Sequence, residues 1–197
     1  FGGIGAGAGI IAHATSSALT SGLNSTFVGD NARIFKSITG YSNTAFGYDT
    51  LLNNTSGYEN AAFGVGAGGA ITTGHGNVAF GPWALTNATS TVGNLAIGAY
   101  ALTNTIGSTN VGIGSNAMQD NITGTQNISI GSNSLFGNTS ATNTIAIGYE
   151  AGAGNYTPYS NQKGTYIGVD AGYNLQTGSD GNTLIGFQSA RNLTIGA

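Results

Sequence analysis

A glycine recurs about every 17 residues along almost the whole chain, and this repeat constrains the fold more than any other feature of the sequence. Each such glycine ends a five-residue segment, as in Asn43–Gly47 (NTAFG), Asn77–Gly81 (NVAFG) and Asn127–Gly131 (NISIG). The series starts at Gly29 and continues with Gly47, Gly64, Gly81, Gly98, Gly114, Gly131, Gly148, Gly168 and Gly186. A regular series of this kind predicts a solenoid, in which each repeat packs only on its neighbours.

The five-residue segments have the composition of short β-strands that end at the repeat glycine. A large apolar residue precedes each glycine, another often lies two positions earlier, and the residue between them is small, as in Val78-Ala79-Phe80. Because side chains alternate between the faces of a strand, the bulky residues share one face. The sequence therefore predicts a buried core made of Phe46, Phe63, Phe80, Ile97, Ile113, Ile130, Ile147, Ile167 and Ile185.

A second pattern follows each repeat glycine. The third residue after it is small, and Leu or Met often comes next, as in Ala84-Leu85 and Ala117-Met118. We expect this segment to form a second, weaker strand after a bend at the glycine, before an Asn-, Thr- and Gly-rich turn returns the chain to the next strand. The acidic residues Asp49, Glu150 and Asp170 follow their glycines by two positions, where we expect them to point outward into solvent.

These patterns predict an all-β fold, a parallel β-roll or β-solenoid of about ten 17-residue coils over residues 23–197. Residues 1–22 are rich in Gly and Ala and are expected to form a lead-in or an atypical first coil. Glycine interrupts every candidate helix. A three-sided hexapeptide helix is the closest alternative, but it needs an aliphatic residue at every sixth position, whereas the Ile-Gly or Phe-Gly pair occurs once per coil.

A single coil of this kind is thin, since it supplies only two or three bulky apolar side chains. A lone roll would also leave the face with the small strand residues, such as Ala79 and Ala96, in contact with water. We therefore expect that face to be buried against identical chains in a parallel homotrimer.

Composition excludes several classes of function. The chain has 4 basic and 7 acidic residues, so it cannot build the cationic surface that nucleic acid requires. No segment is long and apolar enough for membrane insertion, and the absence of cysteine rules out disulfides and thiolate metal sites. Gly64–Gly69 fits a dinucleotide fingerprint, but the helix and the acidic residue that it needs do not follow. We predict no catalytic residues, no cofactor and no metal, and hence no enzyme.

The repeats resemble two known families. They are similar to the head repeats of trimeric autotransporter adhesins and, more closely, to repeats of bacteriophage tail-fibre proteins, as residues 43–64 (NTAFGYDTLLNNTSGYENAAFG) illustrate. The resemblance covers residues 23–197 and leaves the choice between the two families open. It implies a left-handed parallel β-roll trimer outside the cell, on a virion or a bacterial surface, that serves for attachment or as a rigid spacer.

The functional hypothesis is therefore a structural and adhesive fibre segment that attaches to a cell surface, either in a phage tail fibre or in the head of a bacterial adhesin. Its partners would be further copies of itself and a receptor or glycan on the host surface. Candidate contacts are the aromatic residues Trp83, Tyr100, Tyr156 and Tyr159, the last two in an enlarged repeat. A minor alternative is an ice- or surface-binding solenoid, suggested by a shared strand position for Thr44, Thr144, Thr165 and Thr183.

Overall fold

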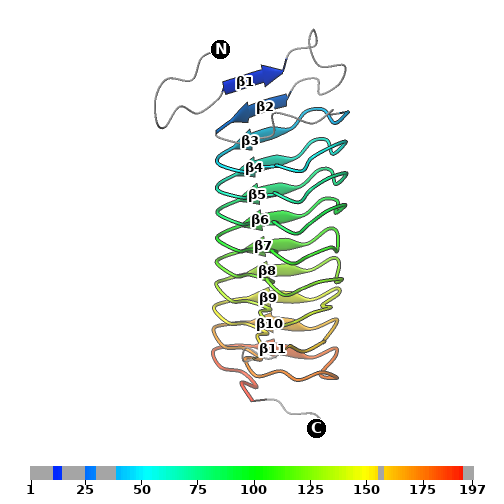
Figure 1. Ribbon diagram of the computed structural model, residues 1–197. Helices are drawn as coiled ribbons and strands as arrows, with labels where there is room; N and C mark the ends of the chain where they lie inside the picture. Colours follow the sequence, from blue (N-terminus) through cyan, green and yellow to red (C-terminus); the bar gives the residue numbers. More distant parts are fainter. Residues whose placement is uncertain (1–10, 15–24, 30–38, 155–157, 193–197) are drawn as a thin grey trace.

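The computed structural model describes residues 11–14, 25–29, 39–154 and 158–192. In this part of the chain there is no helix, and one sheet holds eleven strands in sequence order (Figure 1). The strands are β1 (Ile11–Ala14), β2 (Ser25–Val28), β3 (Thr44–Phe46), β4 (Ala61–Phe63), β5 (Val78–Phe80), β6 (Leu95–Ile97), β7 (Val111–Ile113), β8 (Ile128–Ile130), β9 (Ile145–Ile147), β10 (Thr165–Ile167) and β11 (Thr183–Ile185). The prediction of an all-β solenoid is confirmed.

The strands β2–β11 are parallel and form a solenoid of about nine turns, in which each turn lies directly on the one before it. Equivalent repeat positions pair with one another: Ile113 lies between Ile97 and Ile130. The 17-residue register is thus confirmed. Of the predicted lead-in, residues 1–22, only β1 lies within the described residues, and it pairs with β2 in the antiparallel direction.

The repeat glycines are required for two reasons, which Gly98 illustrates. Its φ is +129°, a conformation that residues with a side chain rarely adopt. A Cβ atom placed on Gly98 would also lie 2.6 Å from the carbonyl carbon of Gly114 in the next coil. The glycines therefore stack backbone on backbone at one corner of the solenoid.

The predicted second strand is wrong, because the segment after each glycine forms consecutive tight turns. Leu85 and Leu102 have φ values of +54° and +52°, which no β-strand contains. The turns still bond from coil to coil, since the backbone N–H of Leu85 donates to the carbonyl of Ala101 at 3.0 Å. This left-handed conformation directs Leu85 and Leu102 into the interior, where both are completely buried.

The predicted core assigned the bulky and small residues to the wrong faces. The small central residue of each strand points inward, whereas Phe46, Phe80, Ile97, Ile130, Ile147, Ile167 and Ile185 are exposed, and Phe63 and Ile113 are half-buried. The interior is only wide enough for a small residue opposite a leucine: a Cβ atom on Gly112 would lie 2.9 Å from Cγ of Leu102. The expectation that the small-residue face meets another chain is therefore also wrong.

A column of buried asparagines runs through the interior beside the strands. The backbone N–H and the side-chain amide of Asn77 both donate to Oδ1 of Asn60 at 3.0 Å, and the same amide donates to the carbonyl of Thr91. The column contains Asn43, Asn60, Asn77, Asn94, Asn110 and Asn127. Thr144 takes the next place in it, so Thr144 does not share the strand position of Thr165, which pairs with Ile145.

The coil between Gly148 and Gly168 is longer than the others, and its interior is filled differently. Tyr166 occupies the central position of β10, where most strands have alanine, and its ring is completely buried. Glycines make room for it, since a Cβ atom on Gly152 would lie 2.7 Å from a Tyr166 ring carbon. The extra chain length thus accommodates an aromatic side chain at a strand position that is Ala, Gly or Ser from β3 to β9.

Candidate functional site

The outward face of the sheet carries a continuous band of uncharged, mostly apolar side chains, which we call the apolar stripe. It has two columns, formed by the first and third residues of strands β3–β11. The first column is Thr44, Ala61, Val78, Leu95, Val111, Ile128, Ile145, Thr165 and Thr183, and the second is Phe46, Phe63, Phe80, Ile97, Ile113, Ile130, Ile147, Ile167 and Ile185. Neither column contains a charged residue.

The stripe is open to solvent along its length. Phe46 exposes 56% of its surface at one end and Ile185 66% at the other, and between them Ile97, Ile130, Ile147 and Ile167 each remain more than one-third exposed. Because the pairing is in register, each side chain stands on its equivalent in the next coil; the rings of Phe63 and Phe80 lie 5.4 Å apart. An uninterrupted apolar surface of this kind marks an interaction site in a soluble protein.

Trp83 and Tyr100, two of the predicted receptor contacts, lie next to each other at the corner that follows the repeat glycines. Their rings are stacked, with centroids 5.1 Å apart and planes 13° from parallel. The opposite face of the indole covers Gly66, where a Cβ atom would lie 2.9 Å from Trp83. The stacking thus covers both faces of the indole and one face of the Tyr100 ring, so Trp83 offers its edge to a ligand.

A second aromatic stack was not predicted from the sequence. Tyr41, Tyr58 and His75 occupy equivalent places in three successive coils, with centroid separations of 4.9 Å and 4.4 Å. The signal was present in the sequence, because these residues are 17 positions apart, as Trp83 and Tyr100 are. In both stacks, the spacing between coils brings rings at one repeat position into contact.

The predicted contacts in the enlarged coil have a different outcome. Tyr159 is buried, and its hydroxyl donates a hydrogen bond to the carbonyl of Gly152. Burial raises the pKa of this phenol well above its ordinary value. The prediction that Tyr159 contacts a receptor is therefore wrong, because the ring fills the interior of the long coil. Tyr156 lies outside the described residues.

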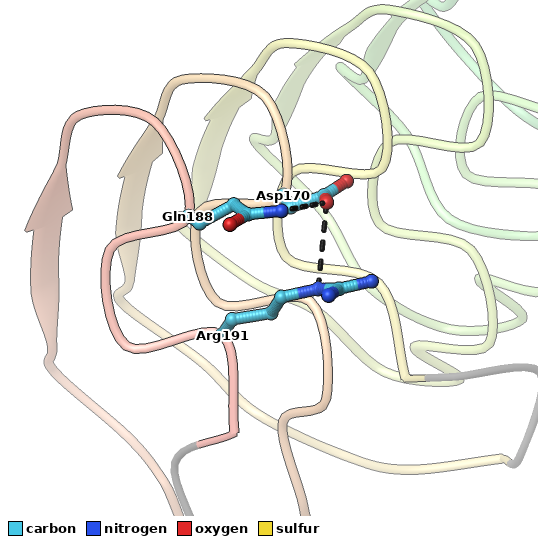
Figure 2. A network of polar contacts seen from close by, with 3 residues as sticks. All are labelled: Asp170, Gln188 and Arg191. Atoms are coloured by element: carbon cyan, nitrogen blue, oxygen red, sulfur yellow. Dashed lines mark hydrogen bonds and ion pairs between the residues drawn. The ribbon is translucent and has the colours of Figure 1, made fainter.

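A small charged network lies near the C-terminal end of the described chain (Figure 2). The carboxylate of Asp170 pairs with Nε of Arg191 at 3.4 Å and accepts a hydrogen bond from the amide of Gln188 at 3.3 Å. Glu150 takes the equivalent position one coil earlier, and both acidic residues are buried. The prediction that Glu150 and Asp170 point into solvent is wrong for both, and the network ties the last coils together.

Several kinds of site are missing from the part of the chain that the structure describes. No group of three or more His, Cys, Asp or Glu residues lies close enough together to hold a metal ion. Gly64–Gly69, which fits the dinucleotide fingerprint, ends a strand and continues as turns. No helix among the described residues could span a membrane.

The apolar stripe is therefore the candidate functional surface, with the stacked aromatic pair beside it as a smaller one. The sequence matches no family model and no curated protein, and the fold matches no solved structure.

Proposed function

We propose that this chain is a segment of an extracellular fibre, on a virion or a bacterial surface, that supports attachment to a cell and assembles as a homotrimer. The observation that carries the proposal is the apolar stripe on an otherwise neutral rod. The phage tail fibre is the preferred setting because residues 43–64 resemble its repeats most closely, and the head of a bacterial adhesin is the alternative.

The architecture suits a rigid spacer. Each coil is bonded to the next through the strands, through the turns and through the asparagine column, so bending the rod would break all three kinds of contact together. Only 6% of the residues are charged, so salt screening and titration change few of these contacts. Such a rod keeps its shape in the variable conditions found outside cells.

The stripe supports the trimer, although not through the face expected from the sequence. Bulky side chains that point outward cannot be buried by the chain that carries them. Three copies arranged around an axis parallel to the rod would bury all three stripes and leave the turns outside. Cyclic symmetry of this kind closes the assembly sideways, so the rods do not aggregate into sheets.

The ice-binding alternative receives no support. Thr144 lies in the interior column, so three of the four threonines hold the shared strand position, together with Thr26, and Ala, Val, Leu and Ile separate Thr44 from Thr165. Other threonine hydroxyls are engaged by the protein itself: those of Thr55 and Thr72 donate to carbonyls of the next coil at 3.0 Å.

Two measurements test the proposal. Light scattering should give three times the chain mass of 19.5 kDa, and electron microscopy should show straight rods. Fluorescently labelled rods should then bind one or more types of bacterial or animal cell, and an excess of unlabelled rods should compete. Native β-structure at the mass of one chain would contradict the trimer, and trimers that bind no cell surface would reduce the role to a spacer.

A further inference from the structure

We infer that the rod has a built-in opening point between β9 and β10, at which residues 165–192 separate from the preceding coils as one unit. The inference goes beyond the proposed function, because it concerns where the rod yields rather than what it binds. It rests on the contacts that join neighbouring coils, which differ at this interface from those at the interface before it.

The first observation is that the asparagine column ends at β9. Oδ1 of Asn127 accepts the backbone N–H of Thr144, the residue directly before β9. The equivalent residue before β10 is Gly164, and a Cβ atom placed there would overlap the hydroxyl of Tyr166. That hydroxyl is buried and has no hydrogen-bond partner among the described residues, so it does not replace the missing amide. The buried polar link that joins the preceding coils is therefore absent between β9 and β10.

The second observation concerns the turns that lead back to the strands. Between the coils of β8 and β9, the backbone N–H of Thr139 donates to the backbone carbonyl of Tyr159 at 2.8 Å. Between the coils of β9 and β10, the N–H of Ser160 donates instead to the side-chain hydroxyl of Thr177, and a second N–H donates to the carboxylate of Asp180. Both of these bonds are exposed, so water competes for the side-chain acceptors and the turns are held less firmly.

The third observation is that the two coils beyond this interface are joined to each other. The charged network in Figure 2 links the coil of β10 to the coil of β11, since Asp170 pairs with Arg191. The two coils also share an apolar interior, because a Cβ atom on Gly172 would lie 3.1 Å from Leu184 and 3.2 Å from Tyr166. The segment therefore keeps contacts of its own when it separates from the rest of the rod.

Opening breaks the pairing of β9 with β10 and withdraws the Tyr166 ring from Gly152. Strand pairing has the same in-register form at the neighbouring interface between β8 and β9, so it does not decide where the rod opens. The remaining links decide this, and a protein opens locally where its contacts are weakest. A point of this kind lets the C-terminal coils yield to a pull while the coils up to β9 stay closed.

Hydrogen exchange of the full chain, measured by mass spectrometry in its assembled form, tests the inference. The amides of Gly168 and Asp170 bond across the interface between β9 and β10, and the equivalent amides of Gly131 and Asn133 bond across that between β7 and β8. We expect peptides with the first pair to exchange about tenfold faster, with an abrupt step at the interface. Equal rates, or a gradual rise from coil to coil as in simple fraying, would overturn the inference.

Disulfides across single interfaces give the second test, because the sequence has no cysteine. Ser160→Cys combined with Thr177→Cys joins two residues that bond across the opening point, and its oxidised form should slow exchange throughout 165–192 about tenfold. The matched control is Ser140→Cys combined with Ser160→Cys, which joins two hydroxyls in contact one interface earlier. Its oxidation should leave exchange in 165–192 unchanged.

The reduced forms of both double variants show whether the substitutions alone alter exchange, and mass spectrometry shows that each disulfide has formed. If the two disulfides slow exchange of the C-terminal coils equally, or if neither does, the rod does not open between β9 and β10 and the inference is wrong.

Discussion

The two sides of the same three-residue strands differ more than any other two regions of the molecule. In β6 the central Ala96 is completely buried, whereas its neighbour Ile97 is more than one-third exposed. Inside, the available space selects the residue, and only small side chains fit opposite Leu102 and its equivalents. Outside, no part of the same chain limits the size, and the residues are large and apolar. Within the strands β3–β9, therefore, small residues point into the core and most of the large apolar residues point outward.

The largest effect is expected from a charge on the inner side. Ala96→Asp would place a carboxylate without a partner in a dry interior, at a cost of several kcal/mol, because a buried charge loses its hydration. We expect loss of β-structure in circular dichroism. The matched control, Ile97→Asp, puts the same charge on the outer side and should keep the fold while weakening assembly. Equal unfolding by both variants would contradict the distinction between the two sides.

The next effect concerns the corner where coils stack. Gly114→Ala should destabilise the fold by about 3 kcal/mol or more, because φ is +131° and the new Cβ would lie 2.6 Å from the backbone of Gly131. Gly186→Ala is the control, since its φ is +118° but, among the described residues other than its chain neighbours, no atom lies within 4 Å of the added Cβ. Urea unfolding of the two variants separates steric overlap from backbone strain. A Gly114→Ala variant as stable as the control would argue against close stacking.

The asparagine column should give a smaller effect. Asn77→Ala removes two side-chain donors and the oxygen that accepts the backbone N–H of Asn94. Leaving these buried groups unpaired should cost about 2–3 kcal/mol in urea unfolding. Asn87→Ala removes an amide from an exposed ladder and should cost less than about 0.5 kcal/mol. Similar losses of unfolding free energy in the two variants would show that the buried hydrogen bonds stabilise the fold no more than the exposed ones.

The smallest effect at neutral pH is expected for Tyr166→Phe, because no group within the protein bonds to the buried hydroxyl. Burial raises the pKa of Tyr166 to about 12, whereas an unfolded tyrosine titrates near pH 10. The stability that comes from keeping the Tyr166 phenol neutral is fully present below pH 10. As the pH rises from 10 to 12, the free energy of unfolding falls by about 1.4 kcal/mol per pH unit. The Phe variant should show a shallower decline when urea unfolding is measured between pH 10 and pH 12, and an unchanged slope would contradict the role of burial.

The sequence was sufficient to predict the solenoid, its period and the pairing of equivalent residues, because glycine position and strand alternation both depend on local chemistry. It was not sufficient to predict which face is inside. That choice depends on the distance between the strand layer and the turn layer, which follows from the left-handed residues such as Leu85 and Leu102. A leucine in that conformation has no distinctive sequence pattern, so the segment was interpreted as a strand.

The candidate site was predictable only in part. The second column of the stripe was identified from the sequence, but as core, and the neighbouring position of Trp83 and Tyr100 followed from their spacing. Tyr159 was assigned to the surface because long loops usually protrude. Here the longer coil surrounds two buried rings, those of Tyr159 and Tyr166, and this requires tertiary information that no local pattern supplies.

The asparagine column also suggests an order in which the coils fold. Oδ1 of Asn43 accepts from Asn60, and Oδ1 of Asn60 accepts from Asn77, so from Asn43 to Asn127 each side-chain oxygen of the column is bonded by the coil that follows it. A chain made from its N-terminus would therefore add coils to a template that presents unpaired acceptors at its growing end. Folding becomes a one-dimensional zippering process in which each step depends only on the last coil formed. An error in one coil would then stop the order from spreading to the coils beyond it.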